Sequence, residues 1–381
     1  MPDPIPLCDI SAQYRPLAGE LEAAVLRVLR SGQGINGPDV AAFEKEAAAW
    51  CGVKHAVGCA DGTTAILLAL AALDVGPGDE VIVPPFTFFA TVGSVARLGA
   101  TPVFADIDPT TFNLDPVAVE RAITPKTRGI LPVHLFGQCA DMDAINAIAQ
   151  RHGLFVVEDA AQSFGASYRG RACGGLADVG TFSFYPSKNL GTLGDGGMVT
   201  TDDADLAKKL FALRNHGSEV KYYHKYMGWN ARLDTVHAAM LRVKLPHVAG
   251  WLAGRRAAAD RYDALIRDHA LGSHLTRPVR QRDCGHTFNQ YVVRVSGGRR
   301  DALLAHLKAN QIGCEVYYPL SLHQQDCLRY LGHRVGDFPH SEAAAKDVIA
   351  LPMFAELTPA QQTRAIETCG TFLRREVRRA A

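Results

Sequence analysis

Short apolar runs alternate with helix-like stretches along the first two thirds of the chain. Four apolar runs have the length of buried β-strands, and they cover residues 80–85, 101–107, 129–136 and 154–159. Between them, apolar residues recur with helical spacing and end at a glycine or proline, which predicts helices over 90–100, 116–123 and 143–153. This order of strand and helix predicts an α/β fold, in which helices cover both faces of a mainly parallel sheet.

The pattern changes near Leu245. Residues 255–270 predict one long helix, and residues 290–295 and 314–318 predict strands that flank a helix over 301–311. These elements indicate a smaller α+β lobe. Because 381 residues exceed the length of most single domains, we expect a large domain over 1–250 and a small C-terminal domain over 251–381.

Composition narrows the classes of partner. Lysine and arginine nearly balance aspartate and glutamate, with a formal net charge of +1, so nothing favours nucleic acid or an acidic membrane surface. The nine cysteines form no C-x-x-C pair and no regular spacing, which predicts neither disulfides nor a metal site. The opening residues MPDPIPLCDI lack a basic segment and an apolar core, and no run of eighteen apolar residues follows. We therefore expect a cytoplasmic protein without a membrane span.

Candidate chemistry begins where a short strand-like run meets a helix, at residues 55–73. Gly62, Thr63 and Thr64 stand at this junction, and the N-terminus of a helix offers free N–H groups to a phosphate. The alternative is that a threonine simply caps the helix.

Two charged residues follow later strands. Asp159 comes directly after four apolar residues, where it could either cap the next helical stretch or meet a buried positive partner. Lys188 lies between an aromatic strand-like run and a glycine-rich stretch, in FSFYPSKNLGTLGDGG. A single lysine is ordinarily a solvated surface side chain, whereas a desolvated lysine has a lowered pKa and can act as a nucleophile.

Taken in order, these features match the needs of pyridoxal 5′-phosphate. The helix start would hold the phosphate, Asp159 would keep the ring nitrogen protonated, and Lys188 would bind the cofactor covalently. We therefore predict a cofactor-dependent enzyme.

The chain also resembles the DegT/DnrJ/EryC1/StrS family of pyridoxal-phosphate-dependent sugar aminotransferases. The resemblance covers nearly the whole length, and its segments are GQGINGPDVAAFE, CADGTTA, PPFTFFAT, VVEDAAQSFGA, FSFYPSKNLGTLGDGGM, RNHG, YYHKYMGWNARLD and CEVYYPLSLHQQ. It implies the aspartate aminotransferase fold, known as fold type I. Some members carry histidine at the lysine position and act as dehydratases, so Lys188 implies a transaminase.

The resemblance also implies roles for the matching residues around the cofactor. Lys188 and Asp159 would be catalytic, and the cofactor would further contact Gly62, Thr63, Phe88, Gln162, Ser183 and Asn230. Phe88 would stack on the ring, unless it is a core aromatic beside Phe86 and Phe89. Asn230 would reach the phosphate in the other subunit of a homodimer with shared sites.

A second set would contact the substrate, namely Arg232, Tyr317, Tyr318 and His323. Arg232 would meet an anionic group, unless it forms an ion pair with Asp234. The hydroxyl and imidazole groups of the other three could bond sugar hydroxyls, although the tyrosines could instead pack the small lobe against the large one.

The implied reaction moves an amino group from glutamate to a nucleotide-linked keto-sugar. The form of residues 314–325 resembles that of members that aminate C-3, which favours a 3-keto hexose or hexuronate on a UDP or dTDP carrier. The alternatives are amination at C-4, a non-catalytic regulatory protein of the same family, and a lyase or desulfurase of the same fold.

Overall fold

A seven-stranded sheet forms the centre of the protein. The structure is a computed structural model that describes residues 3–380, with side chains up to residue 374. The strands of this sheet are β1 (His55–Cys59), β2 (Glu80–Val83), β3 (Thr101–Phe104), β4 (Thr127–Ile130), β5 (Phe155–Asp159), β8 (Val179–Ser183) and β9 (Gly197–Thr201). Their spatial order is β1-β9-β8-β5-β4-β2-β3, and only β9 runs antiparallel to its neighbours. The prediction of a mainly parallel sheet is confirmed.

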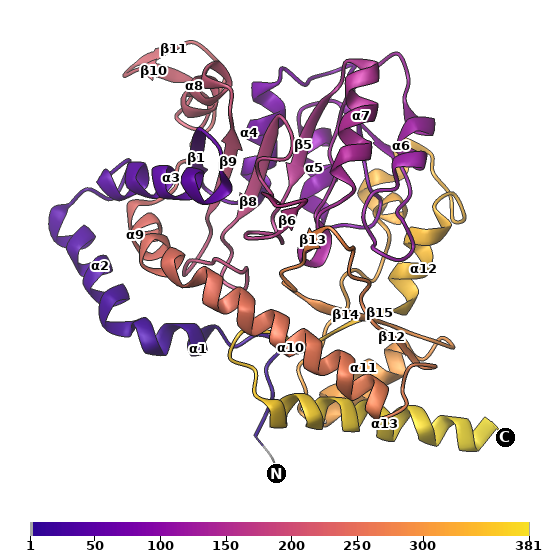
Figure 1. Ribbon diagram of the computed structural model, residues 1–381. Coiled ribbons are helices and arrows are strands. Elements are labelled where there is room, and N and C mark those ends of the chain that lie inside the picture. The colour runs from indigo at the N-terminus through magenta and orange to yellow at the C-terminus, as the bar shows by residue number, and fades with distance from the viewer. Residues whose placement is uncertain (1–2, 381) are drawn as a thin grey trace.

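Helices cover both faces of this sheet (Figure 1). One face packs against α3 (Pro38–Cys51), α6 (Pro116–Ala122), α7 (Met142–His152) and α9 (Thr235–Lys244), and the other against α4 (Gly62–Ala72), α5 (Phe89–Arg97) and α8 (Ala204–Leu213). Alternate strand residues divide between the two cores, since Ile82 belongs to the first and Val81 and Val83 to the second. Burial on both faces explains why these strands are continuous apolar runs.

A second lobe surrounds a small antiparallel sheet. Its strands are β12 (Leu275–Thr276), β14 (Tyr291–Val295) and β15 (Val348–Leu351), and its helices are α10 (Val248–Asp268), α11 (Arg300–Ala309), α12 (Pro339–Asp347) and α13 (Pro359–Ala380). The predicted boundary between residues 250 and 251 falls inside α10. The start of the chain also belongs to this core, because Ile5 pairs with Ile312 and is buried among the apolar residues of the small lobe.

One predicted strand is wrong. Residues 314–318 form no strand, and only Glu315 pairs with the sheet, through a single bridge to Ala350 of β15. The remaining residues of this segment turn toward the large lobe, where Tyr318 packs on Phe86 and Phe88. The aromatic residues of this segment therefore serve packing between the lobes rather than a strand.

Several smaller elements complete the chain. The helices α1 (Ile10–Tyr14) and α2 (Ala18–Ser31) precede the large lobe, and β10 (Ser218–Val220) pairs with β11 (Tyr223–His224) in a hairpin that projects from its upper edge in Figure 1. A three-stranded sheet joins β13 (Cys284–Gly285), β6 (Ser167–Tyr168) and β7 (Arg171–Ala172), and so ties the small lobe to the large one. Among residues 3–380, no helix has both the length and the apolar character that crossing a membrane requires.

Candidate active site

A cavity of about 880 Å³ lies where the carboxyl ends of the parallel strands face the small lobe. This is the edge at which open α/β sheets bind ligands. Its lining includes most of the residues that the sequence singled out, namely Gly62, Thr63, Phe88, Asp159, Gln162, Ser183, Lys188, Tyr317 and Tyr318. Residues more than 250 positions apart in the sequence therefore meet in one place.

The start of α4 forms one wall of the cavity. Asp61 caps this helix, because its carboxylate accepts hydrogen bonds from the backbone N–H and the hydroxyl of Thr64 at 2.8 and 2.7 Å. The alternative of a threonine cap is thus excluded. Among the described residues, the N–H groups of Gly62 and Thr63 have no acceptor, so they are available to a bound anion.

Ser183, the last residue of β8, packs against the start of α4. A Cβ atom at Gly62 would lie 2.6 Å from the Cβ of Ser183, so only glycine allows the two segments to approach this closely. The serine hydroxyl and the two free N–H groups line the same cavity, and together they form a cradle suited to a phosphate.

Asp159 ends β5 at the floor of the cavity and is almost completely buried. Its carboxylate accepts hydrogen bonds from the hydroxyl of Thr91 at 2.8 Å and from the N–H of Ala161 at 3.2 Å. Burial raises the pKa of this carboxyl group, and the two hydrogen bonds and the nearby Lys188 partly offset the effect. Among the described residues, no cation lies within 4 Å of this carboxylate, so it would gain from a cationic partner.

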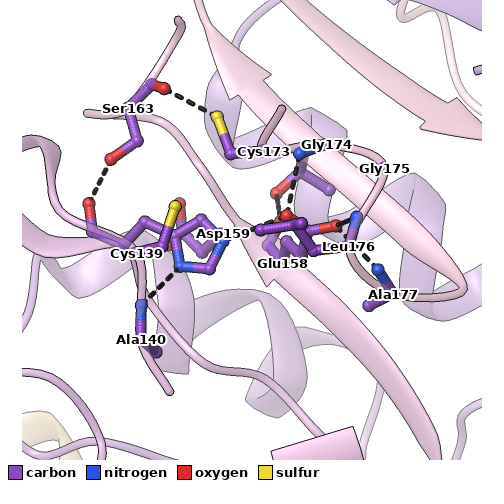
Figure 2. Close-up of polar contacts among 12 residues, drawn as sticks. Cys139, Ala140, Glu158, Asp159, Ser163, Cys173, Gly174, Gly175, Leu176 and Ala177 are labelled. Atoms are coloured by element: carbon purple, nitrogen blue, oxygen red, sulfur yellow. Dashed lines mark hydrogen bonds and ion pairs between the residues drawn. The ribbon is translucent and has the colours of Figure 1, made fainter. Parts of the chain in front are cut away.

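A buried polar network fixes the strand behind Asp159. The neighbouring Glu158 accepts hydrogen bonds from the N–H groups of Gly174, Leu176 and Ala177 at 2.7–2.9 Å, as Figure 2 shows, and lies 3.0 Å from Nε2 of His134. Both carboxylate oxygens are therefore satisfied, although the side chain is fully buried. The network connects β5 to the 174–177 loop and holds the strand end in place.

Lys188 lies in the tight connection between β8 and β9. Its N–H donates to the carbonyl of Tyr185 at 2.9 Å, and the backbone bonds of Phe184 to Gly196 and Thr192 close the loop around it. Burial lowers the pKa of the Lys188 amine to about 8, and attraction to Asp159 raises it again in part. A substantial fraction of neutral amine is thus present near physiological pH.

Gln162 is held in position from both ends of its amide. Its Oε1 accepts from the N–H of Phe136 at 2.7 Å, and its Nε2 donates to the hydroxyl of Tyr318 at 2.9 Å. Phe88 also lines the cavity, with 58% of its surface exposed, so the alternative that it is a core aromatic is excluded. The aromatic residue of this segment that does belong to the core is Phe86, which is buried.

Three predicted residues lie outside the cavity of this chain. Asn230 and Arg232 bond to each other, and Arg232 also donates to Oδ1 of Asn215 at 2.8 Å, so the alternative of an ion pair with Asp234 is not realised. His323 is buried, with one ring nitrogen 2.9 Å from the hydroxyl of Ser321 and the other 3.1 Å from Glu342. Both of its nitrogens are occupied, which corrects the prediction that His323 bonds a sugar.

The cavity also has lining residues that the sequence did not single out. The chief ones are Tyr185, Arg97, Gln290 and Glu315. Tyr185 could have been found, because it lies between Ser183 and Lys188. The other three come from segments without a chemical motif, and only the tertiary structure brings them to the cavity.

These residues fit pyridoxal 5′-phosphate. The cradle at α4 suits its phosphate, the buried Asp159 suits a protonated ring nitrogen, and Lys188 shares the cavity with both. In the described part of the chain, Lys188 is the only lysine that lines this cavity.

Comparison with known proteins agrees with this geometry. Residues 17–369 match the model of the DegT/DnrJ/EryC1/StrS aminotransferase family. The chain is 49% identical to a pleiotropic regulatory protein of Geobacillus stearothermophilus, over 97% of this chain and 99% of the relative. It is 45% identical to a UDP-N-acetyl-3-dehydro-alpha-D-glucosamine 3-aminotransferase of Acidithiobacillus ferrooxidans, over 94% and 95% of the two chains.

Comparison with solved structures indicates the same family. DesV of S. venezuelae, solved in complex with a ketimine intermediate, superposes with a TM-score of 0.94 at 43% identity and covers 97% of this chain and 99% of its own. The fold is that of pyridoxal-phosphate aminotransferases, as predicted. The protein is a pyridoxal-phosphate-dependent sugar aminotransferase, and it belongs to the DegT/DnrJ/EryC1/StrS aminotransferase family.

Proposed function

We propose that the protein transfers an amino group from glutamate to the C-3 ketone of a nucleotide-linked hexose. The observation that carries the proposal is one cavity in which a phosphate cradle, a buried carboxylate and a buried lysine meet. The Acidithiobacillus relative, whose name specifies a 3-keto sugar, supports the position of amination. The nucleotide requires an open site, and Phe88 and Tyr185 at the cavity are both more than half exposed.

The cofactor, when bound, supplies a ring that withdraws electrons from the carbon that carries the amino group. Asp159 keeps the ring nitrogen protonated, because the buried carboxylate gains a cationic partner and the ring proton gains an acceptor. Thr91 and Ala161 orient the carboxylate for this contact through their hydrogen bonds.

Lys188 is the residue that carries a proton during the reaction. Its pKa of about 8 lets the amine both accept a proton from the amino-acid carbon and return it at near-neutral pH. Gln162, fixed by Phe136 and Tyr318, lies ready to contact the ring hydroxyl.

The proposal includes a homodimer in the cytoplasm. Asn230 and Arg232 do not line the cavity of their own chain, and they flank Ala231, whose carbonyl accepts from the N–H of Ala60, next to the cradle. In a dimer they would complete the neighbouring site. Two large apolar side chains of this lobe are exposed, Leu193 at 71% and Met227 at 92%, and an interface would cover them.

The test follows the cofactor spectrum in both half-reactions. Glutamate should convert the purified holoenzyme to its amine-bearing form, and a 3-keto nucleotide sugar should return the original spectrum. A matched 4-keto sugar is the control. Return with the 4-keto sugar alone would place the amination at C-4.

A regulatory role is the second candidate, because the Geobacillus relative is named a pleiotropic regulatory protein. The same experiment separates the two functions. A regulator would bind the cofactor and yet show no spectral change with glutamate and no turnover with any keto-sugar.

A further inference from the structure

A buried serine, histidine and glutamate form a hydrogen-bonded row beside the active site. Nδ1 of His323 lies 2.9 Å from the hydroxyl of Ser321, and Nε2 lies 3.1 Å from Oε1 of Glu342. These are the residue types of a hydrolase triad, but Ser321 has no exposed surface, so no substrate reaches its hydroxyl. The three side chains do not line the cavity, and their role has to be sought in what they hold.

One end of the row binds the backbone that leads to Phe88. The carbonyl of Pro85 accepts from the hydroxyl of Ser321 at 3.1 Å and from the N–H of Leu322 at 2.7 Å. Pro85 stands three residues before Phe88, and Ser321 stands three residues after Tyr318. The rings of Phe88 and Tyr318 both line the cavity, with centroids 6.3 Å apart. The contact at Pro85 therefore joins the two segments that carry this aromatic wall.

The other end of the row is fixed to the central sheet. Glu342 belongs to α12, and the start of this helix is bound by Asp106, which lies two residues beyond β3. The Asp106 carboxylate accepts from the N–H of His340 at 2.9 Å and from the N–H and hydroxyl of Ser341 at 3.0 and 2.6 Å. Since β3 pairs with β2, which leads into Pro85, the row connects the ends of two neighbouring strands.

Packing alone does not account for a histidine at this place. The ring of His323 lies 4.8 Å from that of Phe338 and 6.4 Å from that of Phe104, so it also fills space in the core. An apolar ring would fill the same space without the cost of burying two ring nitrogens. Both nitrogens are instead matched with polar partners, which holds Ser321 in one orientation toward Pro85.

We propose that His323 is a positioning residue for the aromatic wall of the cofactor site. It holds Ser321 on the carbonyl of Pro85, and so fixes Phe88 and Tyr318 relative to each other. Tyr318 in turn bonds Gln162 at 2.9 Å, so contacts to the cofactor ring from two sides depend on the row. The inference rests on the cofactor contacts proposed above, and it does not depend on which ketone is aminated.

Two variants divide the row at its centre. His323→Asn places an amide where Nδ1 lies and keeps the contact with Ser321, but it is too short to reach Glu342. His323→Gln reaches Glu342 and leaves Ser321 without a partner in the ring. His152→Gln is the matched control, because His152 also pairs with a glutamate, Glu120 at 2.8 Å, and does not line the cavity.

Hydrogen exchange of the cofactor-free proteins gives the first measurement. In His323→Gln, the peptides over 84–90 and 316–323 should both exchange severalfold faster than in the wild type. In His323→Asn and in the control they should exchange at wild-type rates. Peptides over β5 and α4 should be unchanged in all variants, whereas a general loss of stability would speed exchange everywhere.

Cofactor binding gives the second measurement. The Kd for pyridoxal 5′-phosphate should rise about fivefold in His323→Gln, which is the size of one aromatic contact. The circular dichroism of the bound cofactor should weaken, because its ring is held less firmly. The Kd for inorganic phosphate should not change, since the row does not contact the cradle at α4. Ser321→Ala should give the same shifts, and the double variant should add nothing to them.

Equal effects of the asparagine and glutamine variants would show that His323 only packs the core, and would overturn the proposal. So would an unchanged cofactor Kd in Ser321→Ala, which decides the question if the histidine variants do not fold. The proposed amino transfer fails separately, through a wild-type holoenzyme whose spectrum does not respond to glutamate. Exchange and Kd are measured without donor or sugar, so they test His323 whatever the outcome of that reaction.

Discussion

At the scale of the residue, burial of Lys188 disfavours the charge on its amine, and binding of the cofactor to the amine would remove this cost. Its amine is buried with a pKa of about 8, against an ordinary value of 10.5, which corresponds to about 3 kcal/mol of unfavourable burial for the charged form. Below pH 8 the folded, cofactor-free protein carries this cost in full. The cost declines as pH rises from 8 to 10.5, because only the unfolded chain still binds the proton in that range.

Lys188→Met should therefore stabilise the cofactor-free protein by up to about 3 kcal/mol at pH 7. The gain should shrink toward zero as the pH approaches 10.5. Urea unfolding of the two cofactor-free proteins between pH 6.5 and 10 measures the difference, in which other titrating groups cancel. A gain that grows with pH would contradict the lowered pKa.

Glu158 provides a second residue-scale prediction. Its carboxylate accepts hydrogen bonds from three backbone N–H groups (Figure 2). It also pairs with His134 at 3.0 Å. Glu158→Gln replaces one acceptor oxygen by a donor and leaves a buried N–H without a partner, which should cost about 1–3 kcal/mol in free energy of unfolding. Thermal unfolding of the holoenzyme measures the loss, with Glu120→Gln as the exposed control. Equal stability of the two variants would show that the loop 174–177 rearranges freely.

The sequence alone identified the site residues that have a distinctive chemical type and stand near a predicted strand end. Asp159 stands at the end of the apolar run over 154–159, and Lys188 follows an aromatic strand-like run after a proline turn, so both stand near strand ends before any contact is known. His323 misled, because an imidazole in a polar-looking segment proved to be buried between Ser321 and Glu342. Glu315 was missed, since nothing local distinguishes a cavity carboxylate from a solvated one.

At the scale of the element, the connection between β8 and β9 is fastened by a helix from elsewhere. Lys244, at the end of α9, is buried and donates to the carbonyl of Gly191 at 2.7 Å, three residues beyond Lys188. Lys244→Met removes this donor and leaves the carbonyl unpaired. The turn over residues 185–191 should then open more often, while β5 remains unaffected.

Hydrogen exchange measures that opening. The peptide containing Lys188 should exchange severalfold faster in Lys244→Met than in the wild type, and turnover should fall with it. Lys126→Met, a change at an exposed position before β4, serves as the control. Unchanged exchange in the 185–191 peptide would mean that the loop is held by its own backbone bonds alone.

Strands could be predicted from the sequence where both faces of the sheet are buried, because such strands are continuous apolar runs. All four strands predicted between residues 80 and 159 are present, and β14 falls within 290–295. The strand predicted over 314–318 is absent because its aromatic residues pack between the lobes, and packing of that kind favours the same residue types as a strand does. The place of β9 between β1 and β8 depends on long-range pairing, which local pattern does not encode.

At the scale of the whole molecule, the first residues stabilise a lobe formed mainly by the last third of the chain. Ile5 is buried in the small-lobe core and pairs with Ile312. Ile5→Ala should lower the free energy of unfolding by about 2–4 kcal/mol, as for other large-to-small core changes. Ile10→Ala is the control, because Ile10 is exposed and its truncation should cost little. Chemical denaturation compares the two, and equal losses would contradict this placement of the N-terminal segment.

The proposed sharing of active sites between two subunits can be tested by mixing two inactive variants. If Arg232 serves the neighbouring site, then heterodimers of Lys188→Ala and Arg232→Ala chains contain one intact site and one doubly altered site. Mixed samples should recover about a quarter of wild-type activity per site when chains pair at random, because half of the dimers are hybrids with one good site. Verified heterodimers without activity would place both residues in the site of one chain.

The antiparallel position of β9 bears on how quickly the lysine can move. Lys188 lies in a connection whose two ends, Ser183 and Gly197, are paired with each other in the sheet. The backbone of this connection is thereby tied at both ends, and the bonds of Phe184 to Gly196 and Thr192 restrain it further. We therefore expect Lys188 to pass between cofactor and substrate by rotations about its own side-chain bonds. Such rotations are far faster than the microsecond-to-millisecond movements of lids, so the lysine sets no lower limit on the duration of a catalytic cycle.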